Sequence, residues 1–218
     1  MSYFSKQFSS NSFQVENLGG IKIKEEDISS KFKVVIIGAT NAGKTSICNK
    51  IIHKPFNDTY TPTKNFASYF PIIEVNNKKI KLDMWEIAGY QKNNCAHEWK
   101  NAAFVVVVYS IIDENSFEVA KEIVNEIREF DESIPIGLVG NQMDKEEERK
   151  VDTSNVVQYA KDKELEFFEE ISAKDNDKFE FVEYISSSLF LNYGEEVNNN
   201  NLSLTKDQII FKKEKKCC

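Results

Sequence analysis

Between Lys33 and Tyr193, segments with two different spacings of apolar residues alternate along the chain. Alternating segments and short apolar runs are typical of β-strands, whereas apolar residues that recur every three or four positions are typical of amphipathic helices. In segment 115–130, for example, Phe117, Ala120 and Ile123 form one stripe. The patterns predict strands at residues 33–37, 66–75, 78–85, 103–111, 134–141 and 166–172, and helices at 43–52, 115–130, 154–163 and 177–193.

The order of these elements predicts the fold class. Strands that alternate with helices form a mostly parallel sheet with helices on both faces, and the β-branched run 103–111 fits a strand buried in such a sheet. Segments 66–75 and 78–85 are separated only by Asn76 and Asn77, which tolerate the positive φ of a tight hairpin turn. We therefore predict an α/β protein with a mostly parallel six-stranded sheet and one antiparallel edge strand.

The two ends of the chain lack this regularity. Residues 1–30 are rich in Ser, Asn and Lys without a sustained period, and residues 194–218 include a run of four asparagines. Such composition is typical of segments that bury too little apolar surface to fold. The sequence predicts one domain at residues 31–193 between a flexible N-terminal extension and a flexible tail.

The overall composition argues against several classes of function. The 218 residues have a net charge of −7 and an isoelectric point near 5.1, whereas nucleic-acid binding needs a basic face. The longest apolar run, 102–112, is too short to cross a membrane, and no apolar secretion signal is visible, so we expect neither secretion nor disulfides. His53 and His97 show no metal-ligand spacing with the cysteines, so no zinc site is expected.

Segment GATNAGKTS, residues 38–46, lies between the first strand and the first helix and fits the phosphate-loop pattern G-x-x-x-x-G-K-[ST]. Its glycines let backbone N–H groups and the helix N-terminus face a phosphate, Lys44 supplies a charge, and the Thr45 hydroxyl suits Mg²⁺. The motif predicts a nucleoside-triphosphate site without specifying the base. The predicted nucleotide-binding residues in it are Gly38, Thr40, Asn41, Ala42, Gly43, Lys44, Thr45 and Ser46.

Segment NQMD, residues 141–144, follows a buried strand at the carboxyl edge of the sheet, where ligands of α/β proteins bind. Here the chain resembles the small GTPases of the Ras superfamily, whose guanine motif is Asn-Lys-x-Asp. The resemblance implies a P-loop G domain in which Asp144 accepts hydrogen bonds from N1–H and the N2 amino group of guanine. Adenine would leave that carboxylate unpaired. Gln142 replaces the family's lysine and implies weaker base binding.

Two further segments extend this resemblance to the guanine site. Segment ISAKD, residues 171–175, is similar to the Ser-Ala-Lys loop of the family, and Phe56 has the spacing of the aromatic residue that stacks on guanine. The resemblance therefore assigns to the base Phe56, Asn141, Gln142, Asp144, Ser172, Ala173 and Lys174.

The switch segments of the family also have counterparts. Segment YTPTK, residues 60–64, resembles the first switch, in which Thr63 matches the threonine that closes over Mg²⁺ and the γ-phosphate, and Tyr60 matches an aromatic lid. Gly89 keeps the N–H that senses the γ-phosphate. Glu86 stands where the family has aspartate and still offers a carboxylate to the Mg²⁺ shell. The implied metal-binding residues are Thr45, Thr63 and Glu86.

The catalytic position departs most from the family, because Tyr90 stands where a glutamine orients the attacking water. One hydroxyl on a rigid ring does not reproduce the donor and acceptor of an amide, and loss of an orienting group costs roughly 10²–10⁴-fold in rate. Gln91, the next residue, offers a replacement if the loop slides. We predict slow hydrolysis with Tyr90 and Gln91 as the catalytic positions. The alternatives are a non-hydrolysing GTP-dependent binding module and an ATP-using phosphate-loop enzyme.

Within the superfamily the chain resembles the Rab proteins. LDMWEIAG and the segment around Trp99 and Lys100 are similar to Rab motifs, although KNFAS after Thr63 is not, and the loop after Gly89 is shorter. The final Cys217 and Cys218 are a typical Rab ending, which implies two prenyl groups. The lysines before them would attract an anionic cytoplasmic leaflet, namely Lys212, Lys213, Lys215 and Lys216.

The resemblance to Rab proteins implies a membrane-anchored GTP/GDP switch in vesicle trafficking, without assigning a particular Rab. Its implied cofactors are GTP or GDP and Mg²⁺. Its implied partners are guanine nucleotide, the cytoplasmic membrane leaflet, exchange factors, GTPase activators, escort proteins of the GDI type, and effectors. The expected location is the cytoplasmic face of endomembranes, with a cytosolic pool.

Overall fold

The computed structural model describes residues 15–17, 27–57, 63, 66–90, 98–176 and 179–193, with the backbone alone for 15–17 and Tyr193. The strands in these ranges are β1 (Val15–Asn17), β2 (Ile28–Gly38), β3 (Phe66–Tyr69), β4 (Ile72–Val75), β5 (Lys78–Ile87), β6 (Phe104–Ser110), β7 (Ile136–Asn141) and β8 (Phe167–Glu170). The helices are α1 (Lys44–Ile51), α2 (Glu114–Phe130), α3 (Thr153–Asp162), α4 (Glu180–Tyr193) and the 3-10 helix η2 (Met143–Glu148).

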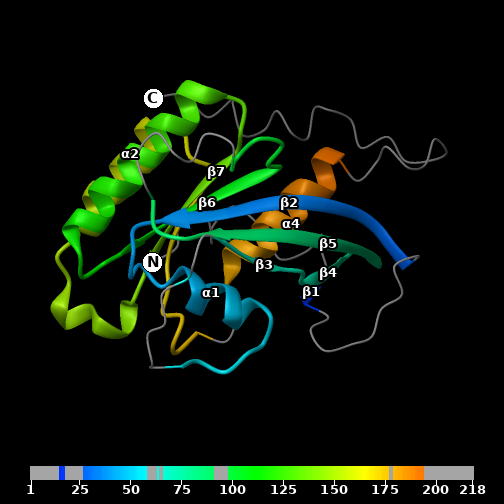
Figure 1. Ribbon diagram of the computed structural model, residues 1–218, viewed down its shortest axis with the longest axis horizontal. Coiled ribbons are helices and arrows are strands. Elements are labelled where there is room, and N and C mark those ends of the chain that lie inside the picture. Colours follow the sequence, from blue (N-terminus) through cyan, green and yellow to red (C-terminus); the bar gives the residue numbers. More distant parts are fainter. Residues whose placement is uncertain are drawn as a thin grey trace, which may run out of the picture.

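The strands of the described residues form one eight-stranded sheet in the order β1-β4-β5-β2-β6-β7-β8, with β3 also paired to β5. The pairs from β5 through β2, β6 and β7 to β8 are parallel, whereas β1, β3 and β4 pair antiparallel. Figure 1 shows β2 and β5 side by side across the middle of the molecule. The predicted fold class, an α/β domain with a mostly parallel sheet, is confirmed.

The prediction of six strands and one antiparallel edge strand needs correction. The predicted strand 66–75 is divided into β3 and β4 around Pro71, which has no N–H for the sheet, although its carbonyl oxygen accepts a bond of 3.0 Å from the Leu82 N–H. β2 begins at Ile28 instead of Lys33. β1, which pairs with β4, lies within the segment expected to be a flexible extension.

The tight turn between β4 and β5 has the predicted backbone conformation. Asn76 and Asn77 have φ values of 50° and 61°, and Val75 pairs with Lys78 on either side of them. Positive φ at both central positions matches the twist of a two-residue hairpin. This turn sets the register of β5, whose end carries Glu86 into the site described below.

The sheet separates two apolar clusters because successive side chains of each strand point to opposite faces. Along β6, Phe104 and Val106 belong to one cluster and Val105 and Val107 to the other. The first cluster includes residues of α1 and α4, and the second includes residues of α2 and α3, so helices cover both faces as predicted. No helix among the described residues has the length and apolar character needed to span a membrane.

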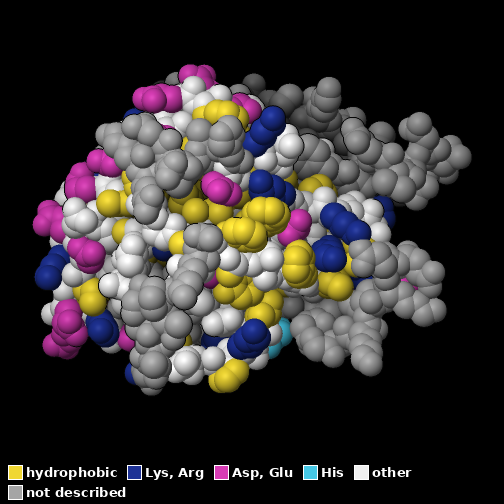
Figure 2. Space-filling view, in the orientation of Figure 1, with side chains coloured by type: hydrophobic (Ala, Val, Ile, Leu, Met, Phe, Trp, Pro, Cys, Tyr) yellow, Lys and Arg dark blue, Asp and Glu magenta, His cyan; other side chains and the backbone are white. Residues whose placement is uncertain are grey.

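The surface of the molecule carries its charges unevenly. Figure 2 shows Asp and Glu side chains gathered along the left edge, over α2, whose 17 residues include glutamates at five positions. Apolar side chains, with Lys and Arg beside them, lie toward the middle and right of the same view. Among the described residues, Phe66 and Phe70 are about half exposed, and Lys81 lies over the Phe70 ring.

Candidate nucleotide-binding site

The phosphate loop, residues 38–46, joins the end of β2 to the start of α1 and depends on its glycines. Gly43 has φ of 84° and Asn41 has φ of 65°, which is the left-handed region. A Cβ atom at Gly43 would lie 2.1 Å from Nδ2 of Asn141, and one at Gly38 would lie 2.0 Å from the Val108 carbonyl oxygen. The backbone therefore curls closely against the sheet at the N-terminus of α1, as a phosphate cradle requires.

The side chain of Lys44 lies within this loop and is 5% exposed. Its Nζ atom donates to the carbonyl oxygens of Gly38 at 3.1 Å and Ala39 at 2.8 Å. Burial lowers the pKa of Lys44, and the nearby carboxylate of Glu86 opposes that effect. The ammonium group is thus held inside the curl of the loop, where it can serve as a point charge for a phosphate.

Three oxygen-bearing side chains converge beside Lys44. Thr45 Oγ1 lies 3.0 Å from Thr63 Oγ1, and both hydroxyls donate to Oε1 of Glu86, the Thr63 bond being 3.1 Å long. Glu86 is 1% exposed. Mg²⁺ prefers octahedral oxygen ligands at about 2.1 Å, so neighbouring ligands are about 3 Å apart, close to the separation of the two hydroxyls.

This donor set fits Mg²⁺ that is bound together with a nucleotide. It offers one carboxylate and two hydroxyls. The described residues contain no group of three or more His, Cys, Asp or Glu that could hold a metal ion. Mg²⁺ in such sites takes its remaining ligands from water and phosphate oxygens. Thr45 and Thr63 would hold the ion, with Glu86 beside them, and the ion would neutralise phosphate charge.

The residues after β5 lie against the phosphate loop. A Cβ atom at Gly89 would meet Thr40 Oγ1 at 2.2 Å, and the Tyr90 N–H donates to the Gly38 carbonyl oxygen at 3.3 Å. The Tyr90 hydroxyl donates to Oε1 of Glu126 on α2 at 2.5 Å, and its half-buried ring packs on the α2 side of the sheet. The backbone of this segment therefore borders the site, while the Tyr90 side chain is bonded to a helix.

Asn141, at the end of β7, connects the phosphate loop to the segment at 171–175. Its Nδ2 donates to the Ala42 carbonyl oxygen at 3.0 Å, and its Oδ1 accepts the Ala173 N–H at 3.0 Å. The side chain is 2% exposed, so both bonds are shielded from water. A single buried amide thus fixes the distance between the predicted phosphate and base segments.

Asp144 and Ser172 come together from η2 and the segment after β8. The Ser172 hydroxyl donates to Oδ1 of Asp144 at 2.9 Å and accepts the Asp175 N–H at 3.0 Å, while Asp144 itself is exposed. Gln142 has a positive φ of 72°, and its Oε1 accepts the Ser110 hydroxyl. The carboxylate is therefore oriented by a neighbour and still accessible to a ligand.

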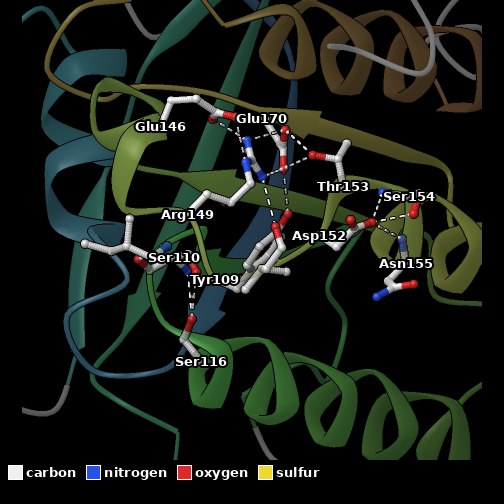
Figure 3. A network of polar contacts seen from close by, with 12 residues as sticks. Tyr109, Ser110, Ser116, Glu146, Arg149, Asp152, Thr153, Ser154, Asn155 and Glu170 are labelled. Atoms are coloured by element: carbon white, nitrogen blue, oxygen red, sulfur yellow. Dashed lines mark hydrogen bonds and ion pairs between the residues drawn. The ribbon is translucent and has the colours of Figure 1, made fainter.

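A network of charged side chains holds Arg149, the residue that follows the helix η2 in which Asp144 lies (Figure 3). Arg149 follows η2 and donates to both carboxylate oxygens of Glu170 on β8, at 2.7 Å and 3.0 Å, and also to Glu146. The Glu170 side chain is 2% exposed and also accepts the hydroxyls of Tyr109 and Thr153. These bonds raise the pKa of Arg149 and burial raises that of Tyr109. The network ties η2 to the strand that leads to Ser172.

The other predicted site residues have varied positions. Phe56 and Ser46 are partly buried, whereas Thr40, Asn41 and Lys174 are exposed. Several predicted residues lie outside the described part of the chain, namely Tyr60, Gln91, Cys217 and Cys218.

Some residues of the site had no signal in the sequence. Tyr69 donates to Glu86, Glu126 accepts from Tyr90, and Arg149 pairs with Glu170. Each of these contacts joins residues that are 17 to 36 positions apart, so only the sheet topology brings them together. Glu170 was a partial exception, because it is a charged residue inside a segment predicted to be a strand, and a charge that becomes buried in a sheet needs a partner.

Fold and site together define a phosphate-loop nucleotide-binding protein. The model of the Ras family matches residues 33–188, well over half of the chain, and the chain therefore belongs to the Ras family. The phosphate-loop, switch and base segments described above all fall within that match.

Relatives with several Rab names resemble the chain to a similar extent. Ras-related protein Rab-13 of Bos taurus is 31% identical over 178 residues, which cover 78% of this chain and 86% of that protein. Ras-related protein Rab-11B of Dictyostelium discoideum is 32% identical over 180 residues, covering 78% and 80%. Rab-5A of the same organism is 33% identical over 147 residues, covering 66% and 73%. The chain is thus a divergent Rab-like small GTPase, and these identities single out no particular Rab.

Proposed function

We propose that this Rab-like protein is a guanine-nucleotide switch that binds GTP and GDP with Mg²⁺. The observation that carries the proposal is the placement of Asp144. Its carboxylate is oriented by Ser172, and the loop that contains Ser172 is bonded through the Asn141 amide to the phosphate loop. One ligand that contacts both loops must therefore combine a phosphate group with a group that donates hydrogen bonds to a carboxylate.

Guanine has the chemistry that Asp144 requires. Its N1–H and N2 amino group are adjacent donors, and a carboxylate accepts both. Adenine has an acceptor at N1 and no substituent at C2, so it would leave the carboxylate without its bonds. Leaving such a group unsatisfied costs about 1–3 kcal/mol and more when it is charged. This penalty would make the site select guanine over adenine.

The test exchanges the acceptor at Asp144 for an amide. Asp144→Asn would retain one acceptor and gain a donor, which suits the C2 carbonyl of xanthine and repels the N2 amino group of guanine. We expect the variant to lose about 10–100-fold in GTP affinity, from the 1–3 kcal/mol above, and to bind XTP more tightly than GTP. Competition of GTP, XTP and ATP against a fluorescent GDP analogue measures all three affinities.

Glu147 provides the matched control for this exchange. It is an exposed carboxylate on η2, so Glu147→Gln makes the same chemical change on the same element. This variant should keep the nucleotide preferences of the wild type. Equal binding of GTP and ATP by the wild-type protein would contradict the proposal and favour an ATP-using enzyme. An unchanged preference for GTP over XTP in Asp144→Asn would contradict the role of Asp144 in selecting the base.

We further propose that intrinsic GTP hydrolysis is slow. The hydroxyl of Tyr90 is bonded to Glu126 on α2, and the hydroxyl alone lacks the paired donor and acceptor of a glutamine amide. The same observation favours the second candidate function, a GTP-dependent binding module that recruits partners without hydrolysis. Single-turnover decay of bound GTP distinguishes the two functions. Slow decay supports the switch, and the absence of any decay supports the binding module.

The proposed biological role follows from the Rab resemblance and the C-terminal residues. Cys217 and Cys218 would carry prenyl groups, and the lysines before them would contact the anionic cytoplasmic leaflet of endomembranes. The switch would then recruit effectors for vesicle transport under control of exchange factors, GTPase activators and GDI-type escort proteins, with a cytosolic pool of extracted protein.

A further inference from the structure

Glu86 is a buried carboxylate whose two oxygens have different partners. Oε1 accepts the hydroxyls of Thr45 and Thr63, which face the proposed Mg²⁺ position. Oε2 accepts the hydroxyl of Tyr69 at 2.9 Å. Because the residue is 1% exposed, water cannot replace either set of bonds. One oxygen thus belongs to the site, and the other is held from the neighbouring strand.

The register of β3 and β5 explains how Tyr69 reaches this carboxylate. Ala67 pairs directly with Glu86, and Tyr69 pairs with Met84. Tyr69 and Ala67 are two positions apart and share one face of β3, so Tyr69 is the diagonal neighbour of Glu86, a separation that long side chains span. Ala67 presents only a methyl group opposite the carboxylate, which leaves room for the phenol ring.

The phenol acts as a stable donor in this position. A phenol has an ordinary pKa of about 10, so the Tyr69 hydroxyl is protonated at neutral pH and donates to Oε2 of Glu86. A glutamate has one more side-chain torsion than an aspartate, and an unanchored carboxylate would populate several rotamers. The bond from Tyr69 removes that freedom and keeps Oε1 directed at the two threonine hydroxyls.

We propose that Tyr69 is a positioning residue for Mg²⁺-dependent nucleotide binding, which acts by fixing the Glu86 carboxylate from strand β3. The inference rests on the proposed function, since it needs Mg²⁺ and a guanine nucleotide at this site. It adds that the glutamate in place of the family's aspartate works as a pair with Tyr69. The pairing predicts that the effect of removing the Tyr69 hydroxyl depends on which acid occupies position 86.

The test measures release of a fluorescent GDP analogue from the full-length protein as Mg²⁺ is titrated. Loss of an outer partner of a metal site typically costs 10–100-fold in metal affinity, so Tyr69→Phe should require about tenfold more Mg²⁺ to slow release to half its maximum. Only folded, loaded protein contributes to the signal, so a modest loss of stability leaves the readout intact. The rise in melting temperature with added Mg²⁺ at saturating GDP gives a second measure.

Tyr184 offers the matched control, because its hydroxyl donates to a glutamate, Glu166, at 2.7 Å on another part of the fold. Tyr184→Phe should leave the Mg²⁺ requirement unchanged. In a variant that already carries Glu86→Asp, the shorter carboxylate does not reach the phenol. There, Tyr69→Phe should change the Mg²⁺ requirement by less than about twofold, because the bond between the two side chains is already lost.

The outcomes separate this inference from the function on which it rests. A Mg²⁺ requirement that is equal in wild type and Tyr69→Phe overturns the role of Tyr69 and leaves the switch proposal standing. An equal loss with glutamate and with aspartate at position 86 also overturns it, since Tyr69 would then act by another route. Wild-type protein whose GDP release ignores Mg²⁺ overturns the proposed function and the inference together.

Discussion

Tyr90 has its backbone at the phosphate loop and its hydroxyl on a helix. Its N–H donates to the Gly38 carbonyl oxygen, so the backbone stays at the phosphate loop, while the hydroxyl donates to Glu126 at 2.5 Å. Nucleotide sensing in this class depends on backbone N–H groups, whereas hydrolysis depends on the side chain that orients water. We therefore expect the residue to preserve the first contribution and to remove the second, in line with the slow hydrolysis proposed above.

Restoring the amide should restore hydrolysis. We expect Tyr90→Gln to accelerate single-turnover GTP decay by about 10²-fold or more, the usual contribution of a positioned orienting group. Tyr90→Phe is the matched control, because it keeps the ring and removes the hydroxyl that donates to Glu126, so the hydrolysis rate should stay at the wild-type level. The loss of that bond should lower the free energy of unfolding by about 1 kcal/mol, measured by urea denaturation.

Two results would contradict this interpretation of Tyr90. If wild-type protein hydrolyses GTP as fast as Tyr90→Gln, the tyrosine does not limit the reaction. If Tyr90→Gln stays slow but Gln91→Ala slows it further, the neighbouring amide already orients the water, as the sliding-loop alternative predicts.

At the scale of elements, the start of α4 depends on a carboxylate from a neighbouring strand. Glu169 on β8 accepts the N–H groups of Glu180 at 3.2 Å and Phe181 at 2.7 Å, so it satisfies donors in the first turn of the helix. Burial raises the pKa of Glu169 to about 7, and the two N–H bonds oppose that shift only in part. The cap is therefore a titrating group inside the fold.

The sign of the resulting pH dependence follows from linkage. The folded state keeps the Glu169 proton between its ordinary pKa of 4.5 and about 7, where the unfolded chain has lost it. The free energy of unfolding from this group is therefore highest below pH 4.5 and falls as pH rises to about 7, by about 3 kcal/mol at most.

Glu169→Gln removes that titration, so the difference in free energy of unfolding between variant and wild type should change with pH. Between pH 5 and pH 8, the free energy of unfolding of the variant should rise by about 2 kcal/mol relative to that of the wild type, measured by urea denaturation at each pH. Glu183→Gln, an exposed change on the same helix, should follow the wild type at both pH values. A constant difference between Glu169→Gln and wild type would show that Glu169 does not titrate in this range.

The sequence predicts elements whose pattern is local and misses those that depend on a distant partner. The β-branched run of β6 and the stripe of α2 are visible in a short window, and the Asn76 and Asn77 turn follows from backbone preference alone. The break at Pro71 was also available, because proline has no N–H. β1 was not, because three residues are too short for a period and its pairing with β4 is set by the sheet edge.

The same distinction holds within the site. The phosphate loop and the NQMD segment are contiguous in sequence, so their residue types and spacing were sufficient to predict them. Tyr69 carries no such mark, since its role depends on the register that places Ala67 opposite Glu86. The Arg149 network likewise depends on β8 lying next to the segment after η2. Contacts between strands far apart in sequence need the assembled sheet.

At the scale of the whole molecule, the negative net charge of the chain is repelled by the anionic membrane surface to which the proposed anchor would attach. The chain has a net charge of −7, and Figure 2 shows acidic side chains along the α2 edge, whereas the residues before the final cysteines are rich in lysine. An anionic leaflet would repel the domain and attract the basic segment. We therefore expect α2 to face away from the membrane when the chain is anchored there.

The anchor should need both cysteines as well as the lysines. One prenyl chain gives marginal membrane binding and two signals give stable binding, so Cys218→Ser should leave the cell-prenylated protein largely in the supernatant of a vesicle sedimentation assay. Replacing Lys212, Lys213, Lys215 and Lys216 with glutamine should weaken binding to phosphatidylserine-rich vesicles by about 1 kcal/mol per lysine and leave binding to neutral vesicles unchanged. Added salt should weaken only the wild-type interaction with anionic vesicles, because screening acts on exposed charges. Sedimentation of Cys218→Ser equal to that of wild type would show that one chain suffices and that the paired cysteines are not the anchor proposed here.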